Sequence, residues 1–184
     1  MKQNVIASFF ERVGLHVVRL DESQTGLLQD LQERCRDFIQ LATGHPPQPT
    51  EAIHLLRALP PGKSSEDKFV LGFSRNHSVL VGVLELVRGY PDPFTWYIGL
   101  LMLDPQERGQ GLGYRIYETL EQWVITQGDR SLRLIVQAQN LKRLAFWRRV
   151  GFEFEETATQ AIATGTNVVY KMVHHLTVPE EGAV

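Results

Sequence analysis

The sequence lacks the features that mark secreted, membrane-spanning and disulfide-stabilised proteins. Its single cysteine, Cys35, has no partner for an internal disulfide, which favours a reducing compartment. No apolar run approaches the roughly 20 residues that a membrane span requires. The short run Val5–Phe10 ends at the charged pair Glu11 and Arg12, so no signal peptide is recognisable. We therefore expect a cytoplasmic protein without a membrane partner, in which Cys35 is a buried structural thiol.

A marked excess of charge is also absent. Lys plus Arg number 19 and Asp plus Glu number 21, which gives a formal net charge of −2. This balance gives no support for nucleic acid or an anionic membrane as a partner. A local basic cluster of Arg143, Arg148 and Arg149 is interpreted as a solvated helix face. The length of 184 residues predicts one domain with its own core, residues 1–177, followed by a frayed tail, 178–184.

The most informative segment that is present is Leu103–Gly113, with the sequence LDPQERGQGLG. Its glycines at 109, 111 and 113 follow an apolar strand and precede an amphipathic helix. A loop without side chains at these positions lets the backbone approach a ligand closely. The helix that follows directs unpaired N–H groups and a partial positive charge at the same place. The segment therefore predicts a phosphate-binding loop.

Two familiar phosphate-binding motifs do not fit. The dinucleotide fingerprint G-x-G-x-x-G fails because its last position falls on Tyr114 or Ile116. A P-loop ending at Gly62–Ser64 fails because Arg57 stands where its first glycine belongs. The pattern that remains is R-x-x-G-x-G, which covers Arg108–Gly113.

This pattern, with Leu103 and Pro105 upstream, resembles the acyl-CoA-binding loop of the GCN5-related N-acetyltransferase (GNAT) superfamily. A second segment, Asn140–Phe152, resembles a later motif of the same family: an asparagine, a helix and a closing Gly-Phe. Within it, Asn140 is a good N-cap, and Asn140, Leu144 and Trp147 share one helix face. Two motifs in the right order are far more specific than either alone.

The resemblance covers residues 79–155 well and implies both a fold and a ligand. The implied fold is α/β (α+β): a mixed, mostly antiparallel sheet of about seven strands with helices on both faces. A parallel, splayed strand pair would then hold acetyl-CoA as co-substrate, with no metal. The residues that we expect to bind CoA are Leu101, Met102, Leu103, Arg108, Gly109, Gln110, Gly111, Leu112, Gly113, Tyr114, Asn140, Phe146 and Trp147.

Hydrophobic periodicity predicts the order of the elements. We expect one helix from Leu27 to Ala42 and a second from the glycine loop to Gly128. Strands are predicted at 15–20, 67–74, 78–87, 94–103, 132–136, 152–155 and 168–174. We expect the unit from Phe94 to Val136 to be a right-handed crossover between parallel strands, which would place a ligand at the carboxyl ends of those strands.

Acetyl transfer to an amine requires a base and a proton donor for the thiolate. The strand before the glycine loop contains no carboxylate, so Glu85 on the preceding strand is the best candidate base, followed by Asp92 in the adjoining turn. Ordered water is the alternative to a dedicated base. Relatives commonly have tyrosine at the position of Trp147, and an indole N–H is not a usable acid. Tyr97, Tyr170 or water would then protonate the thiolate.

The leading interpretation is an N-acetyltransferase that transfers acetyl to a primary amine of a small molecule or peptide by direct attack on the thioester. The alternative is a non-catalytic acyl-CoA-binding module, and transfer of a longer acyl chain is a third reading. Tyr90, Asp92, Trp96 and Tyr97 form either a mouth suited to a cation or an aromatic core. A homodimer is an open expectation.

Overall fold

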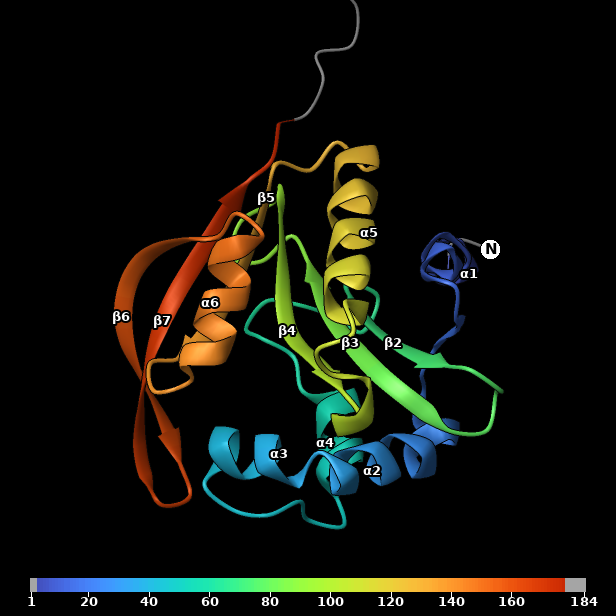
Figure 1. The fold of residues 1–184 in the computed structure, drawn as a ribbon. Coiled ribbons are helices and arrows are strands. Elements are labelled where there is room, and N and C mark those ends of the chain that lie inside the picture. The colour runs from blue at the N-terminus through green and yellow to red at the C-terminus, as the bar shows by residue number, and fades with distance from the viewer. Residues whose placement is uncertain (1–2, 178–184) are drawn as a thin grey trace, which may run out of the picture.

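The computed structural model describes residues 3–177, so the tail predicted at 178–184 lies outside the described residues. The chain builds one seven-stranded sheet with helices on both faces (Figure 1). The strand order is β1-β2-β3-β4-β5-β7-β6. The strands are β1 His16–Arg19, β2 Lys68–Ser74, β3 Leu80–Arg88, β4 Thr95–Leu103, β5 Ser131–Gln137, β6 Glu153–Ile162 and β7 Gly165–His175.

Only one neighbouring pair in this sheet is parallel. β4 and β5 run in the same direction, and every other pair is antiparallel. The parallel pair is joined by the crossover helix α5, Leu112–Thr126. The mixed, mostly antiparallel sheet that the resemblance implied is therefore confirmed, together with its parallel pair.

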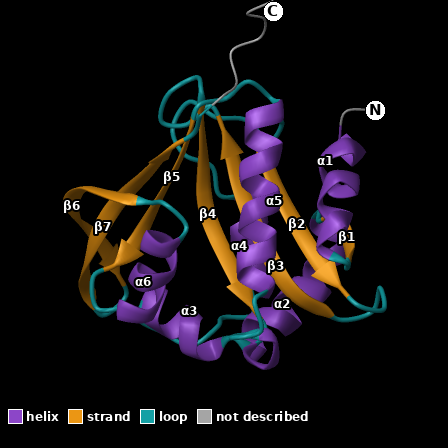
Figure 2. Ribbon diagram, turned by 45° about the horizontal axis from the view of Figure 1, so that its top comes forward, coloured by secondary structure: helices purple, strands orange, loops and turns teal. Residues whose placement is uncertain are grey.

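Three helices cover one face of the sheet: α1 Gln3–Phe10, α5 and α6 Leu141–Arg149 (Figure 2). α5 forms because its apolar residues recur at helical spacing, and Ile116, Leu120 and Val124 are at most 1% exposed. They pack in one core with Phe10 of α1 and with inward-facing strand residues, among them Leu71, Phe73, Leu84, Leu86, Trp96, Ile98, Leu132 and Leu134.

The opposite face is covered by α2 Thr25–Arg34, α3 Arg36–Thr43 and α4 Glu51–Arg57. Their core is a second cluster, which pairs the helix residues with the alternate residues of β2, β3 and β4. Its members include Leu28, Leu31, Phe38, Ile39, Ala52, Val70, Leu80, Val83, Leu100 and Met102. Because successive strand side chains point to opposite faces of the sheet, the same strands contribute residues to both cores. Short 3-10 turns lie at Glu11–Val13, Glu22–Gln24 and Pro105–Glu107.

The single helix predicted from Leu27 to Ala42 is wrong. The chain breaks at Cys35 into α2 and α3, because Cys35 leaves helical geometry at φ −95° and ψ 28°. The thiol is fully buried and donates to the carbonyl of Leu103 at 3.3 Å. The break turns α3 away from α2 and toward the end of β4. Cys35 is therefore a buried structural thiol, as the sequence predicted.

Two further departures concern the ends of the chain. Helix α1 was not predicted, although Ile6 and Phe10 on it are buried. Strands β6 and β7 extend well beyond the predicted 152–155 and 168–174 and form a long hairpin. The hairpin tip contacts the end of α3, where the Ala163 amide donates to the Thr43 carbonyl at 3.0 Å. Polar residues along β6 gave no alternating signal, because nearly all of that edge strand is exposed.

Candidate functional site

The parallel strands β4 and β5 separate soon after they meet. Their register contains only three pairs, from Thr95 opposite Ser131 to Tyr97 opposite Arg133. The two hydroxyl groups of the first pair lie 2.6 Å apart and hold the strands together at that end. Beyond Tyr97, β4 continues beside β3 alone and β5 beside β7 alone. The inner edges of both strands therefore present backbone groups that no neighbouring strand uses.

A β-bulge lies where the separation begins. Glu85 pairs with Leu100 and Leu86 with Ile98, which leaves Gly99 as the extra residue. A Cβ atom at Gly99 would be 2.8 Å from a carboxylate oxygen of Glu85, so a side chain there has no room. Bulges bend and re-aim a strand. Here the bend turns β4 away from β5 and opens the pair.

The glycine loop follows the carboxyl end of β4. Gly109 and Gly111 have φ values of +76° and +79°, the left-handed region that glycine adopts without strain. Within residues 3–177, no hydrogen-bond acceptor faces the amides of Gly109, Gln110 or Gly111. Helix α5 begins at Leu112, and its first amides also lack intrahelical partners. The loop therefore presents a row of donors at a helix N-terminus, the arrangement that binds phosphate.

Arg108 holds this loop in place. Its guanidinium donates to the Leu103 carbonyl at 3.0 Å and forms a two-point ion pair with Asp37 of α3 at 2.6 and 3.1 Å. The hydrogen bond with Asp37 raises the pKa of Arg108 and lowers the pKa of that carboxyl. The α2–α3 break thus brings α3 against the end of β4, and Arg108 fixes the contact.

Helix α6 forms the other wall beside the loop. Asn140 caps it, with its side-chain oxygen accepting from the Arg143 amide at 3.3 Å. A Cβ atom at Gly113 would be 3.5 Å from Leu103 and 3.8 Å from Phe146, so a glycine lets α5 pack closely against both. Leu103 and Phe146 are thus brought to the loop, and the two sequence motifs meet in space.

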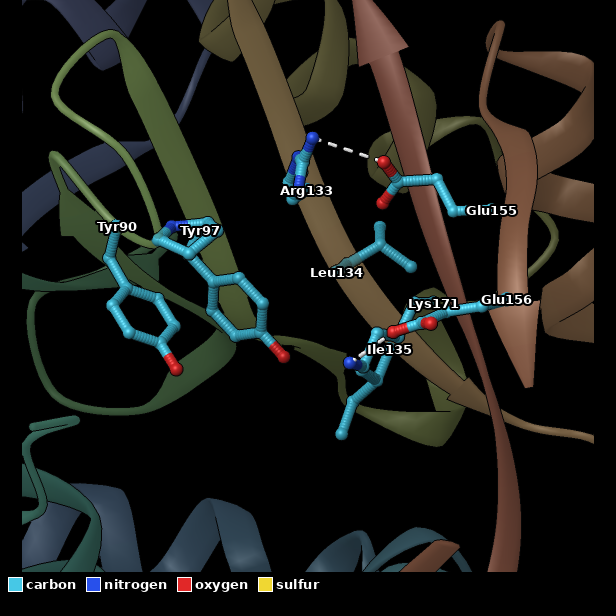
Figure 3. A pocket seen from close by; sticks show the side chains of 9 residues that line it. Tyr90, Tyr97, Arg133, Leu134, Ile135, Glu155, Glu156 and Lys171 are labelled. Carbon is cyan, nitrogen blue, oxygen red and sulfur yellow. Dashed lines mark hydrogen bonds and ion pairs between the residues drawn. The ribbon is translucent and has the colours of Figure 1, made fainter. Parts of the chain in front are cut away.

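A pocket of about 330 Å³ lies where β4 and β5 separate. Figure 3 shows Tyr90 and Tyr97 on one side of it and two ion pairs on the other. Arg133 of β5 contacts Glu155 of β6 at 3.0 Å, and Lys171 of β7 pairs with Glu156. Pro91, Leu134 and Ile135 complete the lining. The pocket therefore offers aromatic surface together with charges of both signs.

Comparison with known proteins agrees with this geometry. A model of the acetyltransferase (GNAT) family matches residues 28–152, more than half of the chain. The chain belongs to the GNAT family.

An uncharacterised N-acetyltransferase of Bacillus subtilis, YobR, is 22% identical over 116 residues, which are 63% of this chain and 43% of that protein. An uncharacterised protein of Mycobacterium leprae is 32% identical over 81 residues, 44% of this chain and 22% of that protein. The chain thus spans less than half the length of either curated relative.

Solved structures show the same GNAT fold. The ribosomal-protein-S18-alanine N-acetyltransferase of Escherichia coli superimposes with a TM-score of 0.67 at 14% identity, covering 92% of this chain and 99% of that one. The PaiA N-acetyltransferase of Thermoplasma acidophilum, solved in complex with coenzyme A, gives 0.60 at 18% identity, covering 88% and 98%. At these identities the likeness speaks for the fold alone.

The predicted CoA residues of this GNAT protein lie on the second half of β4, on the glycine loop with the start of α5, and on α6 with its N-cap. Leu101 and Leu103 pack against the same core as Phe146, while the side chain of Met102 is 1% exposed and faces the α2 core. The side chain of Met102 therefore points away from the glycine-loop side of the sheet. Tyr114 is exposed on the first turn of α5.

Trp147 belongs to the core beneath α6. It is 7% exposed and packs edge-on against Tyr117 and Phe152, with ring centroids 5.9 and 5.2 Å away. The hydroxyl of its neighbour Tyr117 forms a hydrogen bond with His174 Nδ1 at 2.5 Å. Burial raises the pKa of the Tyr117 phenol. No sequence pattern indicated the Tyr117–His174 contact, because the two residues lie far apart in the chain, on α5 and β7.

The three predicted catalytic residues are not brought together. Tyr97 lines the pocket, and burial, with Tyr90 and Glu85 nearby, raises its pKa to about 12. Glu85 instead pairs with the buried Lys68 at 2.6 Å. Tyr170 packs against Phe154 at a centroid distance of 5.4 Å and does not line the pocket. Their roles in catalysis remain predictions, but only Tyr97 borders the pocket.

The four residues for which a mouth or an aromatic core was expected divide between a pocket and the core. Tyr90 and Tyr97 line the pocket with centroids 5.4 Å apart. Trp96 is 1% exposed and donates to Asp129 at 2.5 Å, so it belongs to the core. Asp92 accepts from the Thr95 hydroxyl at 2.6 Å and holds the turn before β4. The residues that sequence reasoning missed are those from β5, β6 and β7: Arg133, Ile135, Glu155, Glu156 and Lys171.

Within residues 3–177, no group of three or more His, Cys, Asp or Glu side chains is arranged to hold a metal ion. No helix in that part of the chain is both long enough and apolar enough to cross a bilayer.

Proposed function

We propose that this GNAT protein is an acetyl-CoA-dependent N-acetyltransferase that transfers acetyl to a primary amine of a small molecule or peptide. The observation that carries the proposal is the opened β4–β5 pair with a glycine loop at its carboxyl end. The free amides of Gly109, Gln110 and Gly111 suit a diphosphate. No neighbouring strand pairs with the inner edge of β4 at Leu101–Leu103. This edge suits the amides of pantetheine, which would bind there as an additional strand.

The pocket beside Tyr97 suits the acceptor. An alkyl amine has a pKa near 10.4, so the neutral nucleophile at pH 7 costs about 4.6 kcal/mol. A site walled by Tyr90 and Tyr97 desolvates the ammonium and lowers that cost. Glu155 and Glu156 supply negative charge at the rim, although each is already paired with a cation. Ordered water then removes the proton, since Glu85 is held by Lys68.

Tyr97 acts in this proposal as a hydrogen-bond donor to the departing thiolate. Its pKa of about 12 keeps the phenol neutral throughout the physiological range. An alkyl thiol has a pKa near 8.5, so complete proton transfer from this phenol is uphill by about 3.5 units, or about 5 kcal/mol. A neutral donor stabilises the developing charge without giving up its proton. Water delivers the proton that finally reaches the thiol.

A non-catalytic acyl-CoA-binding module is the second candidate, and Trp147 favours it because an indole cannot replace the tyrosine of relatives as an acid. Both candidates predict CoA binding, so turnover separates them. The experiment measures release of free thiol from acetyl-CoA with amino acids, polyamines, aminoglycosides and short peptides. We expect amine-dependent release for at least one class.

Calorimetry with acetyl-CoA provides the companion measurement. Binding without thiol release across the panel would favour the module. Absence of both binding heat and thermal protection at saturating acetyl-CoA would overturn the proposal itself. Gly111→Ala is the matched loop variant, because its φ of +79° strains any residue with a Cβ atom, and it should bind acetyl-CoA more weakly.

A further inference from the structure

Arg143 lies in the first turn of α6, on the same helix side as Asn140 and Phe146. The sequence pattern predicted that Arg143 forms part of a solvated helix face, but its side chain instead packs against α3. Its guanidinium carbon lies 3.6 Å from the centroid of the Phe38 ring of α3. Arg148 and Arg149, further along the same helix, are exposed. Arg143 is therefore placed in the junction of α3 and α6, close to the glycine loop.

The charge of Arg143 is not neutralised by the protein. Within residues 3–177, no carboxylate forms an ion pair with it, and no group accepts a hydrogen bond from its side chain. The nearby carboxylate, Asp37, already makes its two-point contact with Arg108. Arg143 is half-buried, and its guanidinium nitrogens are not among the fully buried atoms that lack partners, so they keep some exposure to solvent. Two cations thus lie near one carboxylate, which pairs with only one of them.

Three effects oppose a cation in this position. Burial and the positive charge of Arg108 lower the pKa of Arg143 to about 10, so it is still charged at pH 7. The N-terminal turn of a helix also disfavours positive charge. The contact of the guanidinium with the face of the Phe38 ring offsets part of this cost. An anion bound at the junction would compensate all three effects at once.

We propose that Arg143 is a phosphate-binding residue that holds a phosphate group of coenzyme A from the α6 side of the glycine loop. The inference rests on the proposed function, because it assigns a side chain to the same ligand. A guanidinium donates two parallel hydrogen bonds to phosphate oxygens, whereas the loop contributes backbone amides. Phe38 is the positioning residue that keeps the fork in place.

Coenzyme A carries its phosphates in two places, the diphosphate and the 3′-phosphate of the ribose. Calorimetry with coenzyme A and with 3′-dephospho-coenzyme A separates the two. Arg143→Gln should bind coenzyme A about tenfold or more weakly than the unaltered protein, as expected for loss of a charged hydrogen bond. An equal loss toward both ligands assigns Arg143 to the diphosphate. A loss confined to coenzyme A assigns it to the 3′-phosphate.

Arg148→Gln is the matched control, since it removes the same charge from an exposed position on the same helix. It should change either affinity less than about twofold, in keeping with weak exposed electrostatics. Should Arg143→Gln not fold, Arg143→Lys replaces it and is compared with Arg148→Lys. A several-fold weaker affinity is still expected, because lysine cannot present the stacked fork.

Two results overturn the inference while leaving the proposed function intact. One is unchanged affinity of Arg143→Gln for both ligands. The other is an equal loss in the Arg143 and Arg148 variants, which would mean that only net charge matters. If the unaltered protein itself fails to bind coenzyme A, the proposed function and the inference fall together.

Discussion

The role of a charged side chain in this protein depends on the group with which it pairs in the fold, as Glu85 shows. Glu85 was the best carboxylate candidate for a base because of its place on the strand beside β4. In the fold its carboxylate is 2.6 Å from the Lys68 amine, which also donates to the carbonyls of Leu55 and Ala58 at 2.5 Å. A carboxylate that neutralises a buried lysine has a structural task already.

Replacing Glu85 with glutamine should therefore lower stability more than turnover. Glu85→Gln leaves the buried Lys68 charge without its counter-charge, and we expect a loss of about 1–3 kcal/mol in the free energy of unfolding. Turnover, measured by thiol release below the melting temperature, should stay within a few-fold of normal. A loss of about a hundredfold at unchanged stability would instead identify Glu85 as the base.

At the scale of elements, the site depends on where β4 stops pairing with β5. The bulge at Gly99 and the three-pair register produce the opening, and neither strand contains it alone. Helix α3 then closes the same end through Arg108–Asp37 and the stacked pair Arg143–Phe38. Figure 1 shows α3 lying beneath the lower ends of β4 and α6. The break at Cys35 is what frees α3 to reach this position.

Substitution of Gly99, the extra residue of the bulge, should affect both stability and turnover. Gly99→Ala places a Cβ atom 2.8 Å from the Glu85 carboxylate, which the ion pair with Lys68 prevents from moving freely. We expect a loss of about 1–3 kcal/mol in stability, as in other overpacked sites. Turnover should fall as well, because the bend that opens the strand pair shifts. Thermal melting and thiol release measure the two effects.

Gly26→Ala is the control, since a Cβ atom there meets nothing within 4 Å and the position lies in helix α2. It should be neutral or slightly stabilising. The double variant Glu85→Ala, Gly99→Ala removes the obstructing carboxylate and should be less destabilised than the sum of the single variants. Strict additivity would contradict the proposed steric conflict.

At the scale of the whole molecule, Asp104 ties the end of β4 to the helical layer. Its carboxylate accepts from Arg34 of α2 at 2.6 Å and from the Gln106 amide at 2.9 Å. Burial opposes its charge, but the bonds from Gln106 and Arg34 prevail and lower its pKa. Arg34 also donates to the Leu80 carbonyl at 2.6 Å, so one network joins α2, β3 and the loop after β4.

This network predicts part of the acid sensitivity. A carboxyl whose pKa is lower in the folded state stabilises the fold above its unfolded pKa of 3.8, and loses that contribution as pH falls through the folded value. Asp104→Asn should therefore be less stable at pH 7 by about 1–3 kcal/mol. The difference in unfolding free energy between Asp104→Asn and the unaltered protein should shrink below about pH 4. Urea unfolding at several pH values tests this, and a constant difference would refute it.

Much of the fold was predictable because the signals are local. Alternating apolar residues located the strands, and the R-x-x-G-x-G pattern at Arg108–Gly113 located the loop before any contact was known. The helix break at Cys35 was not predictable, since the apolar period runs through it and a contact with Leu103 decides it. The ends of β6 were missed because an exposed edge strand has no buried face to impose alternation. A homodimer stays a prediction.

The sequence by itself determined the family and the loop, because glycine spacing and helix capping act between near neighbours in the chain. Tertiary structure alone decided which side chains surround the loop and the pocket. Asp37 and Arg108 are 71 positions apart, and the pocket wall facing Tyr97 comes from β5, β6 and β7. Charge compensation depends on distance in space, which a linear sequence does not record. Glu85 therefore has a partner, and Arg143 has none among residues 3–177, for reasons that only the folded chain reveals.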